Sequence, residues 1–324
     1  MQRVIFTKFG RPAEVAQLEE FTPPSPGPDE VAVRMIAAPI NPADFLLMTG
    51  THAFRPPLPA RPGIKGSGRV IQVGENVQGI TVGDLVAISS GACWTQEMTR
   101  SASEVHVLPP ELDPLQAAMI SINPVTAFSL LTRIVDLKPG DWVLQNAANS
   151  SLGKLVIRIA ADRGLRTLNV VRREDLVSEL KALGADVVLV GDDHLSQRAS
   201  EALHGAPLRL ALDAIAGSSA YRCAECLSDG GTLVTYGLLS GQPIQVPSAR
   251  IVFEQIHLRG FSRLGMFREI GHRRTDELLH ELAGLVIKGR LAVPIEATYP
   301  LPQIQEALSH AERESRGGKI LIEF

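Results

Sequence analysis

The sequence of 324 residues has only three cysteines, and their spacing is irregular. Cys93 stands alone, while Cys223 and Cys226 form a single C-x-x-C pair. An odd and sparse set argues against a disulfide framework. A structural zinc site usually needs four ligands, and no second cysteine pair accompanies this one. We therefore interpret Cys223 and Cys226 as neighbours on one helix face, without a redox or metal role.

Long apolar runs and a strong charge of one sign are also lacking. No run reaches the roughly 20 apolar residues that a membrane span needs. The net charge of −3 gives no support for nucleic acid or an anionic membrane as the partner. The first residues, MQRVIF, form a strand-like pattern without the features of a signal or transit peptide. We expect a cytoplasmic protein that binds neither nucleic acid nor a membrane.

The length and the change of pattern along the chain predict two domains. Residues 1–115 are rich in short strands, such as 31–38 and 68–73, and in Pro and Gly turns. After helices at 115–122 and 124–135, strands and helices alternate. Such alternation favours a parallel, doubly wound sheet. The expected strands are 142–146, 167–171, 187–190, 209–214, 231–236 and 257–261, and the expected helices are 151–163, 174–183, 218–228 and 275–288.

The tail, at 292–295 and 319–324, is strand-like again and is expected to return to the first domain. The predicted domains are therefore residues 1–116 with 266–324, and an inserted domain at 117–265.

The most informative segment is residues 145–154, QNAANSSLGK, which lies between a predicted strand and a predicted helix. A turn of small residues at a helix N-terminus can hold a dinucleotide pyrophosphate, which points to Asn149, Ser150, Ser151 and Leu152. The following strand ends on Arg172 and Arg173. An acidic residue there would bind the ribose of NAD, whereas arginine suits the 2′-phosphate of NADP(H).

The turn departs from the G-x-G-x-x-G pattern. Ala148 and Ser150 occupy the places of the first two glycines, and Gly153 occupies that of the third. The alternative interpretation is an ordinary strand-to-helix turn in another α/β protein.

Several further segments share one order with a known superfamily. They are 41–44 (NPAD), 62–68 (PGIKGSG), 73–77 (VGENV), 82–86 (VGDLV), 137–143 (LKPGDWV), 183–186 (LGAD) and 317–321 (GGKIL). Along the whole chain the sequence resembles the medium-chain dehydrogenases/reductases. The resemblance implies a β-rich, GroES-like catalytic domain and a Rossmann-type domain for the cofactor.

Within that superfamily the sequence is most similar to the 2-enoyl thioester reductases of the mitochondrial type, which use NADPH. Residues 123–128 (NPVTAF) resemble their N-P-x-T-A-Y, 146–153 their N-A-S-N-S-G-V-G, and 169–172 their N-V-V-R. The resemblance implies cofactor roles for Asn123, Thr126, Tyr236, Gly237, Leu238, Phe261, Ser262 and Lys319. A core position for Phe261 and a solvated position for Lys319 are the alternatives.

The departures from this branch concern the reaction itself. In the stretch 48–52 (MTGTH), His52 stands where the branch has its proton-donating tyrosine. A histidine could donate the proton near neutral pH, or attract an anion, or lie in a surface loop without a role. We expect Asn41 and Trp94 in the substrate pocket, with the domain core as the alternative for Trp94. The zinc-binding Cys and G-H-E of related dehydrogenases are replaced at 41–44 and 64–66, so we predict no metal.

These features predict a zinc-independent, NADPH-dependent reductase of an activated C=C bond, with a trans-2-enoyl thioester as the first candidate substrate. The alternatives are a quinone or enone reductase and a non-catalytic NADPH-binding protein. The resemblance also implies a homodimer that pairs edge strands within residues 251–261. A helix that covers this strand is the alternative.

Overall fold

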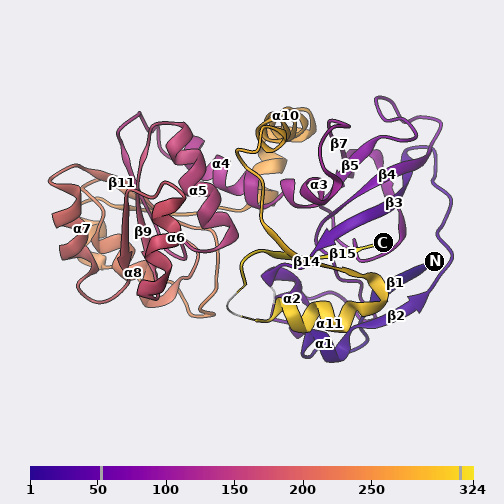
Figure 1. Ribbon diagram of the computed structural model, residues 1–324, viewed down its shortest axis with the longest axis horizontal. Coiled ribbons are helices and arrows are strands. Elements are labelled where there is room, and N and C mark those ends of the chain that lie inside the picture. Colours follow the sequence, from indigo (N-terminus) through magenta and orange to yellow (C-terminus); the bar gives the residue numbers. More distant parts are fainter. Residues whose placement is uncertain (52–53, 314–315) are drawn as a thin grey trace. The chain divides into compact units, whose positions relative to one another are not determined.

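The computed structural model describes residues 1–51, 54–313 and 316–324, so His52 lies outside the described residues. Two compact units make up the chain (Figure 1). We name residues 1–122 with 271–324 the β-rich unit, and residues 123–270 the parallel-sheet unit. Their boundaries differ from the expected 116/117 and 265/266. Helix α3 (Pro114–Ile120) packs on β-rich strands, and Gly271 breaks helix α10 (Arg263–Ile287) with φ 77° and ψ 170°.

The β-rich unit holds a seven-stranded sheet in the order β14-β15-β3-β4-β5-β7, with β6 also paired to β3. The strands are β1 (Gln2–Ile5), β2 (Gln17–Glu20), β3 (Glu30–Pro39), β4 (Gly66–Val73), β5 (Leu85–Ile88), β6 (Glu97–Ser101), β7 (Val105–Val107), β14 (Ile295–Pro300) and β15 (Lys319–Glu323). The helices are α1 (Pro12–Val15), α2 (Pro42–Thr49), α3, the second part of α10, α11 (Ile304–Ala311) and the short η1 (Ala102–Glu104) and η3 (Leu301–Gln303).

The C-terminal strand returns to the first sheet, as expected. Strand β15 pairs antiparallel with β3, so that Leu321 faces Pro39. The expected strand at 292–295 is wrong, because β14 begins only at Ile295. Pro294 has no N–H group to donate to a ladder, and its carbonyl instead accepts the backbone N–H of Lys319 at 2.8 Å.

The parallel-sheet unit has six strands in the order β10-β9-β8-β11-β12-β13, all paired in parallel. This is the Rossmann strand order, and it confirms the predicted doubly wound sheet. The strands are β8 (Trp142–Gln145), β9 (Arg166–Val171), β10 (Val187–Val190), β11 (Leu208–Asp213), β12 (Thr232–Thr235) and β13 (His257–Gly260). The helices are α4 (Asn123–Thr132), α5 (Ser151–Asp162), η2 (Glu174–Leu176), α6 (Val177–Ala182), α7 (Leu195–Leu203), α8 (Gly217–Glu225), α9 (Ser248–Phe253) and the first part of α10.

Two apolar clusters show how helices cover both faces of this sheet. One joins Ile157 of α5 and Leu180 of α6 to Val171 and Val188. The other joins helices α7 and α8 to the opposite face of β9, through residues that include Leu168. Adjacent strand residues point to opposite faces, so a continuous apolar strand can contribute to both clusters.

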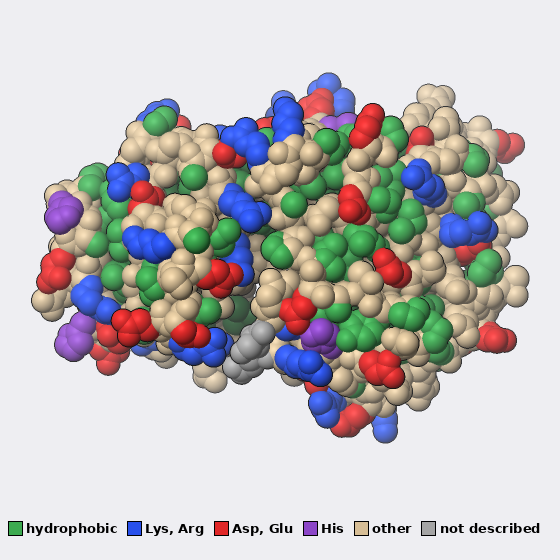
Figure 2. Space-filling view, in the orientation of Figure 1, with side chains coloured by type: hydrophobic (Ala, Val, Ile, Leu, Met, Phe, Trp, Pro, Cys, Tyr) green, Lys and Arg blue, Asp and Glu red, His purple; other side chains and the backbone are tan. Residues whose placement is uncertain are grey.

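Among the described residues no single helix is long and apolar enough to cross a membrane, although the bent pair Pro114–Ile120 and Asn123–Thr132 passes the same test by length and composition. On the face in Figure 2, basic and acidic side chains are interspersed.

Candidate functional site

The turn between β8 and α5 presents backbone donors at the start of a helix. Ser150 is the N-cap of α5, and its hydroxyl accepts the N–H of Gly153 at 3.0 Å. The first N–H groups of a helix have no partner within it. The N–H groups of Ser151 and Leu152 also have no hydrogen-bond acceptor elsewhere in the described part of the chain. They are free to bind an anion, and the helix dipole favours one.

Gly153 allows the turn and the helix to approach each other. A Cβ at this position would lie 2.5 Å from the carbonyl oxygen of Ala148 and 2.8 Å from its carbonyl carbon. Ala148 is completely buried. The third glycine of the pattern is therefore required by packing, whereas Ser150 fits the second place because it caps the helix.

A buried polar network below the turn was not foreseen from the sequence. The Asn146 amide donates to the carboxylate of Asp213 at 2.6 Å and to the Ser219 hydroxyl at 3.0 Å. Its carbonyl oxygen accepts the N–H of Ala214, and Asp213 also accepts the Thr235 hydroxyl at 3.0 Å. The network joins the carboxyl ends of β8, β11 and β12. An aspartate that closes an apolar strand, LRLALD, is the signal that could have revealed it.

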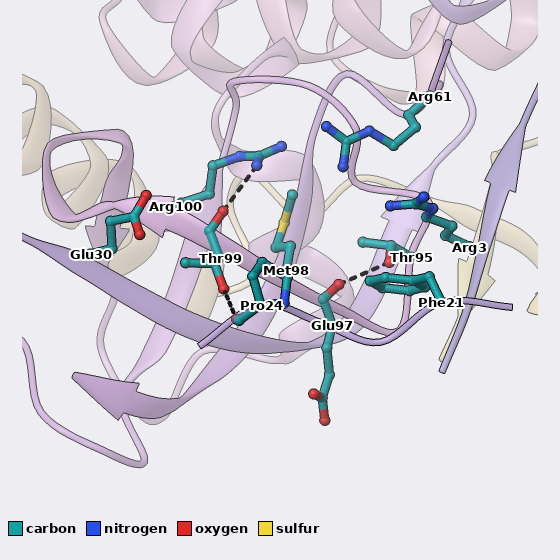
Figure 3. A pocket seen from close by; sticks show the side chains of 10 residues that line it. All are labelled: Arg3, Phe21, Pro24, Glu30, Arg61, Thr95, Glu97, Met98, Thr99 and Arg100. Carbon is teal, nitrogen blue, oxygen red and sulfur yellow. Dashed lines mark hydrogen bonds between the residues drawn. The ribbon is translucent and has the colours of Figure 1, made fainter. Parts of the chain in front are cut away.

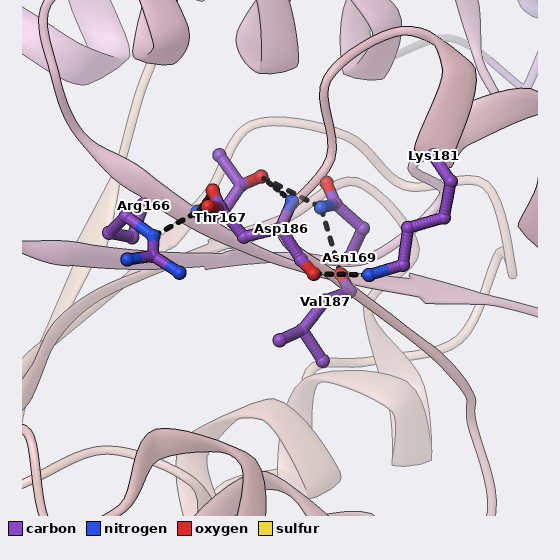
Figure 4. Close-up of polar contacts among 6 residues, drawn as sticks. All are labelled: Arg166, Thr167, Asn169, Lys181, Asp186 and Val187. Carbon is purple, nitrogen blue, oxygen red and sulfur yellow. Dashed lines mark hydrogen bonds and ion pairs between the residues drawn. The ribbon is translucent and has the colours of Figure 1, made fainter.

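Asn169 belongs to a second network, part of which Figure 4 shows. Its side chain accepts the amide of Gln145 at 2.7 Å and donates to the carbonyl of Val187 at 3.1 Å. Gln145 also donates to the carbonyl of Gly153 at 2.9 Å. Asn169 therefore links strands β8, β9 and β10, and Gln145 links this network to the start of α5.

Arg172 and Arg173 directly follow β9, and both are exposed. Arg173 pairs with Asp175 at 3.3 Å. Because β9 is the neighbour of β8, both arginines leave the sheet at the same edge as the turn before α5. This is where a Rossmann-type sheet meets the adenosine ribose.

The last predicted cofactor residues of this unit follow β12 and β13. The hydroxyl of Tyr236 is buried and has no partner among the described residues, and burial raises the pKa of this phenol. A Cβ on Gly237 would meet the carbonyl oxygen of Ala214 at 2.5 Å. Leu238 is exposed, and Phe261 is partly buried. Ser262 has a structural role, because its hydroxyl accepts the N–H of Gly265 at 3.3 Å at the start of α10.

Asn123 and Thr126 both lie on α4, and both are buried. Helix α4 packs against α5, so these two side chains belong to the same unit as the turn. The free donors on α5 and the exposed arginines together fit a dinucleotide with a phosphate on its ribose.

Lys319 and Asn41 lie together in the β-rich unit. The ammonium of Lys319 is buried, not solvated, and donates to the Asn41 side chain at 3.0 Å. Asn41 caps α2, and its N–H donates to Asp44 at 2.8 Å. Asp44 also accepts the N–H of Ile64 at 2.9 Å. Burial raises the pKa of Asp44 to about 6, and burial lowers the pKa of Lys319 to about 8.

The lowered pKa of Lys319 predicts that stability depends on pH. Between pH 8 and 10.5 the folded chain has released this proton while the unfolded chain still holds it. The free energy of unfolding should therefore rise with pH across this interval, by about 3 kcal/mol from this group. The buried cysteines Cys93, Cys223 and Cys226 have raised pKa values and act in the opposite direction above pH 9, so the test is a comparison of variants. In denaturant titrations, as the pH increases from 8 to 10.5, the free energies of unfolding of the wild type and of the exposed control Lys288→Met should rise relative to that of Lys319→Met. Parallel curves for all three proteins would contradict the assignment.

The residues at the catalytic zinc position of related dehydrogenases do not fit that metal here. Lys65 is completely buried, and its ammonium donates to the carbonyl of Met119 at 3.1 Å. Lys65 stands in the segment that replaces G-H-E, so a cationic side chain occupies the place where a metal ligand would be needed. Asp44 is the acid of residues 41–44, and its oxygens already accept the hydrogen bonds described above. We derive no step through zinc at this place.

Trp94 is 1% exposed and belongs to the core of the β-rich unit, next to Gly63. Its burial supports the core role, which was the alternative to a place in the substrate pocket. A cavity of about 390 Å³ in the same unit is lined by Arg3, Arg61 and Arg100, among others (Figure 3). It contains none of the predicted site residues, and we assign it no part in the reaction.

Comparison with known proteins gives the family. Residues 27–110 match the family of alcohol dehydrogenase GroES-like domains, and residues 151–282 match the family called zinc-binding dehydrogenase. The chain is 35% identical to the enoyl-acyl-carrier-protein reductase, mitochondrial, of Xenopus tropicalis over 319 residues, which cover 95% of this chain and 91% of that protein. This chain belongs to the enoyl thioester reductases of the medium-chain dehydrogenase/reductase superfamily.

Solved structures agree with the enoyl thioester reductase family. The Etr1p/NADP/crotonyl-CoA complex is 26% identical with a TM-score of 0.87, and the match covers 100% of this chain and 99% of that one. Etr1p also occurs in a mitochondrial 2-enoyl thioester reductase heterodimer from Candida tropicalis. Escherichia coli quinone oxidoreductase complexed with NADPH is 26% identical with a TM-score of 0.89, and both chains are covered completely. The predicted GroES-like and Rossmann-type fold is thus confirmed.

The expected cytoplasmic location is wrong. The curated relatives from Xenopus tropicalis, Homo sapiens and Arabidopsis thaliana are named as mitochondrial enzymes. The pattern of the first six residues therefore does not identify the compartment of a member of this family.

Proposed function

We propose that this protein is an NADPH-dependent reductase that reduces the C=C bond of a trans-2-enoyl thioester. The main observation behind this proposal is a site suited to NADPH. Free N–H groups at the start of α5 lie at the same sheet edge as Arg172 and Arg173. The relatives named enoyl-acyl-carrier-protein reductase and the Etr1p complex with NADP and crotonyl-CoA support the substrate class.

The chain's own residues would divide the work of binding and proton transfer. Ser151 and Leu152 would donate to the pyrophosphate, while Arg172 and Arg173 would bind the 2′-phosphate. We assign Asn149, Ser150, Asn123 and Thr126 to the same cofactor, together with Tyr236, Gly237, Leu238, Phe261, Ser262 and Lys319. Asn41 is assigned to the substrate. NADPH supplies the hydride when it is bound.

His52 is our candidate for the group that gives a proton to Cα of the substrate. An imidazolium has a pKa suited to proton transfer near neutral pH. The imidazolium of His52 would give its proton to Cα, where the reduced substrate holds negative charge that it shares with the thioester oxygen. A proton from solvent would then restore the imidazolium, so each turnover consumes one hydride equivalent and one proton.

The reduction of a quinone or an enone is the second candidate, since E. coli quinone oxidoreductase has the same fold. This reaction does not require a proton donor from the protein, because a quinone anion can take its proton from water.

One experiment tests the function and the role of His52 together. NADPH oxidation is followed with crotonyl-CoA, a quinone and an enone, in the wild type and in His52→Phe. We expect turnover of the thioester to fall about 100-fold in the variant, as is typical when a general acid is lost. His194→Phe, which replaces an exposed histidine in the parallel-sheet unit, is the control.

Turnover of the quinone alone, unchanged in His52→Phe, would exclude the thioester function and leave His52 without a catalytic role. Binding of NADPH without turnover of any of the three substrates would instead favour a non-catalytic protein.

We also propose a homodimer that forms through β13 and α9. All four residues of β13 are exposed at the edge of the sheet, and an unpaired edge strand readily pairs with a second copy. Helix α9 adds exposed apolar side chains, of which Phe253 is 82% exposed. The related Etr1p/Etr2p reductase of Candida tropicalis is a heterodimer, which supports a two-chain assembly.

Substitution of Phe253 should separate the two copies. A charge in the centre of an apolar interface remains unpaired, so Phe253→Asp should sediment as a monomer while the wild type sediments as a dimer. Val82→Asp is the control, because this side chain lies in the β-rich unit and is 66% exposed. This variant should sediment as a dimer, as the wild type does. A monomeric wild type would contradict the proposal.

A further inference from the structure

Three side chains that the reaction does not use meet in the β-rich unit. The Nδ1 atom of His106, on β7, lies 2.7 Å from one carboxylate oxygen of Asp276. The Nε2 atom of His272 lies 3.3 Å from the other oxygen. The two imidazole rings are stacked, with their centroids 4.8 Å apart and their planes at 25°. One carboxylate therefore faces a nitrogen atom of each of two stacked imidazoles.

The three side chains come from two elements of the β-rich unit, β7 and the second part of α10. His272 and Asp276 are four residues apart on the second part of α10, so they lie on one face of that helix. They occupy its first turns after the break at Gly271. His106 comes from the sheet, and only 8% of its side chain is exposed. The side chains of His272 and Asp276 are 44% and 32% exposed, which leaves the cluster accessible from solvent.

The chemistry and spacing of the cluster suit a transition-metal ion. Imidazole nitrogen and carboxylate oxygen bind zinc at about 2.0–2.2 Å, so two ligands of a tetrahedral ion lie roughly 3.3 Å apart. The two imidazole–carboxylate separations, 2.7 and 3.3 Å, are close to this value, and all three ligand atoms lie within 4.8 Å of one another. Rotation of the partly exposed His272 and Asp276 side chains toward the buried His106 would bring the ligand atoms to this spacing.

We propose that His106, His272 and Asp276 bind a divalent transition-metal ion of the zinc class, with water as a further ligand. The ion would replace the imidazole protons that face the carboxylate and would join β7 to the first turns of α10 after Gly271. Its role is structural, since none of the residues assigned to the cofactor or substrate belongs to it. The proposal departs from our expectation of no metal, which came from the cysteine pattern and the catalytic zinc position.

Binding of Co²⁺ and Zn²⁺ to the metal-stripped, full-length protein tests this site. Visible d–d absorption reports Co²⁺ binding, calorimetry reports the affinity for Zn²⁺, and thermal unfolding is followed with and without a chelator. We expect one ion per chain and a higher Tm with Zn²⁺, because a ligand that binds only the folded state stabilises it. Affinity should fall about tenfold or more in Asp276→Asn and in His272→Gln.

His280→Gln is the matched control, because this exposed histidine lies on the same helix and its ring contacts only the backbone carbonyl of Asp276 among the contacts described. It should bind metal as the wild type does. His272→Gln changes a half-exposed side chain, so its circular dichroism should show a folded protein even if Asp276→Asn unfolds. Equal affinity in all four proteins, or no stoichiometric binding by the wild type at millimolar metal, would overturn the proposal. The NADPH assays are independent of this result.

Discussion

Replacement of both Arg172 and Arg173 by alanine should lower the preference for NADPH over NADH by about 1000-fold. Hydrogen bonds to a charged group contribute about 1.5–3 kcal/mol each, and 1.4 kcal/mol corresponds to a factor of ten. Both side chains are exposed directly after β9, so their loss should leave the core of the sheet intact. The ratio of kcat/KM for the two cofactors, with crotonyl-CoA as the acceptor, measures the effect.

The loss should come almost entirely from NADPH, because NADH lacks the 2′-phosphate that the guanidinium groups would contact. Arg163→Ala is the matched control, since this exposed arginine lies at the opposite end of α5. This substitution should change kcat/KM for NADPH and for NADH by no more than a few-fold. If the double variant keeps the wild-type ratio, the 2′-phosphate is bound elsewhere.

Gly153→Ala should destabilise the parallel-sheet unit and weaken NADPH binding at the same time. The new Cβ would lie 2.5 Å from the Ala148 carbonyl oxygen, and both partners are backbone-bound atoms that cannot rotate away. Overpacking of this kind typically costs 1–3 kcal/mol, so we expect about 3 kcal/mol in denaturant unfolding. The start of α5 must shift, so the dissociation constant of NADPH should rise about 100-fold or more.

Gly284→Ala provides the control for Gly153→Ala. Gly284 is also helical, on α10, and a Cβ there would have nothing within 4 Å. The same substitution should raise the free energy of unfolding by about 0.5–1 kcal/mol, since alanine favours a helix. Similar behaviour of the two variants would show that the approach of Ala148 to Gly153 does not limit either stability or binding.

The alternation of strands and helices was predictable because each element has its own periodic pattern. Strand 187–190 was predicted with the observed bounds, and helix 151–163 differs from α5 by one residue at its end. Helices α7 and α9 were not predicted. The first part of α10 was also missed, since the expected helix began only at residue 275. Gly271 interrupts its pattern, and Ser262 was considered only as a cofactor residue and not also as the cap at the start of a helix.

The candidate site was only partly predictable, because some of its residues act through partners far along the chain. Asn146 was recognised as part of the turn, but its hydrogen bond to Asp213 depends on the strand order. In this sheet β11 lies beside β8 although two other strands separate them in sequence. A local pattern does not contain that information.

Local order in the sequence alone determined the β8–α5 turn, its N-cap and the position of the arginine pair after β9. Each depends on residues a few positions apart, whose geometry follows from strand and helix periods. Only the tertiary structure decided that Lys319 meets Asn41, because β15 returns to pair with β3. It also decided that His106 meets His272 and Asp276, since the second part of α10 packs in the β-rich unit after the break at Gly271. More than a hundred residues separate Lys319 from Asn41, and His106 from His272 and Asp276. Only the packing of the sheet and of α10 brings these side chains into contact.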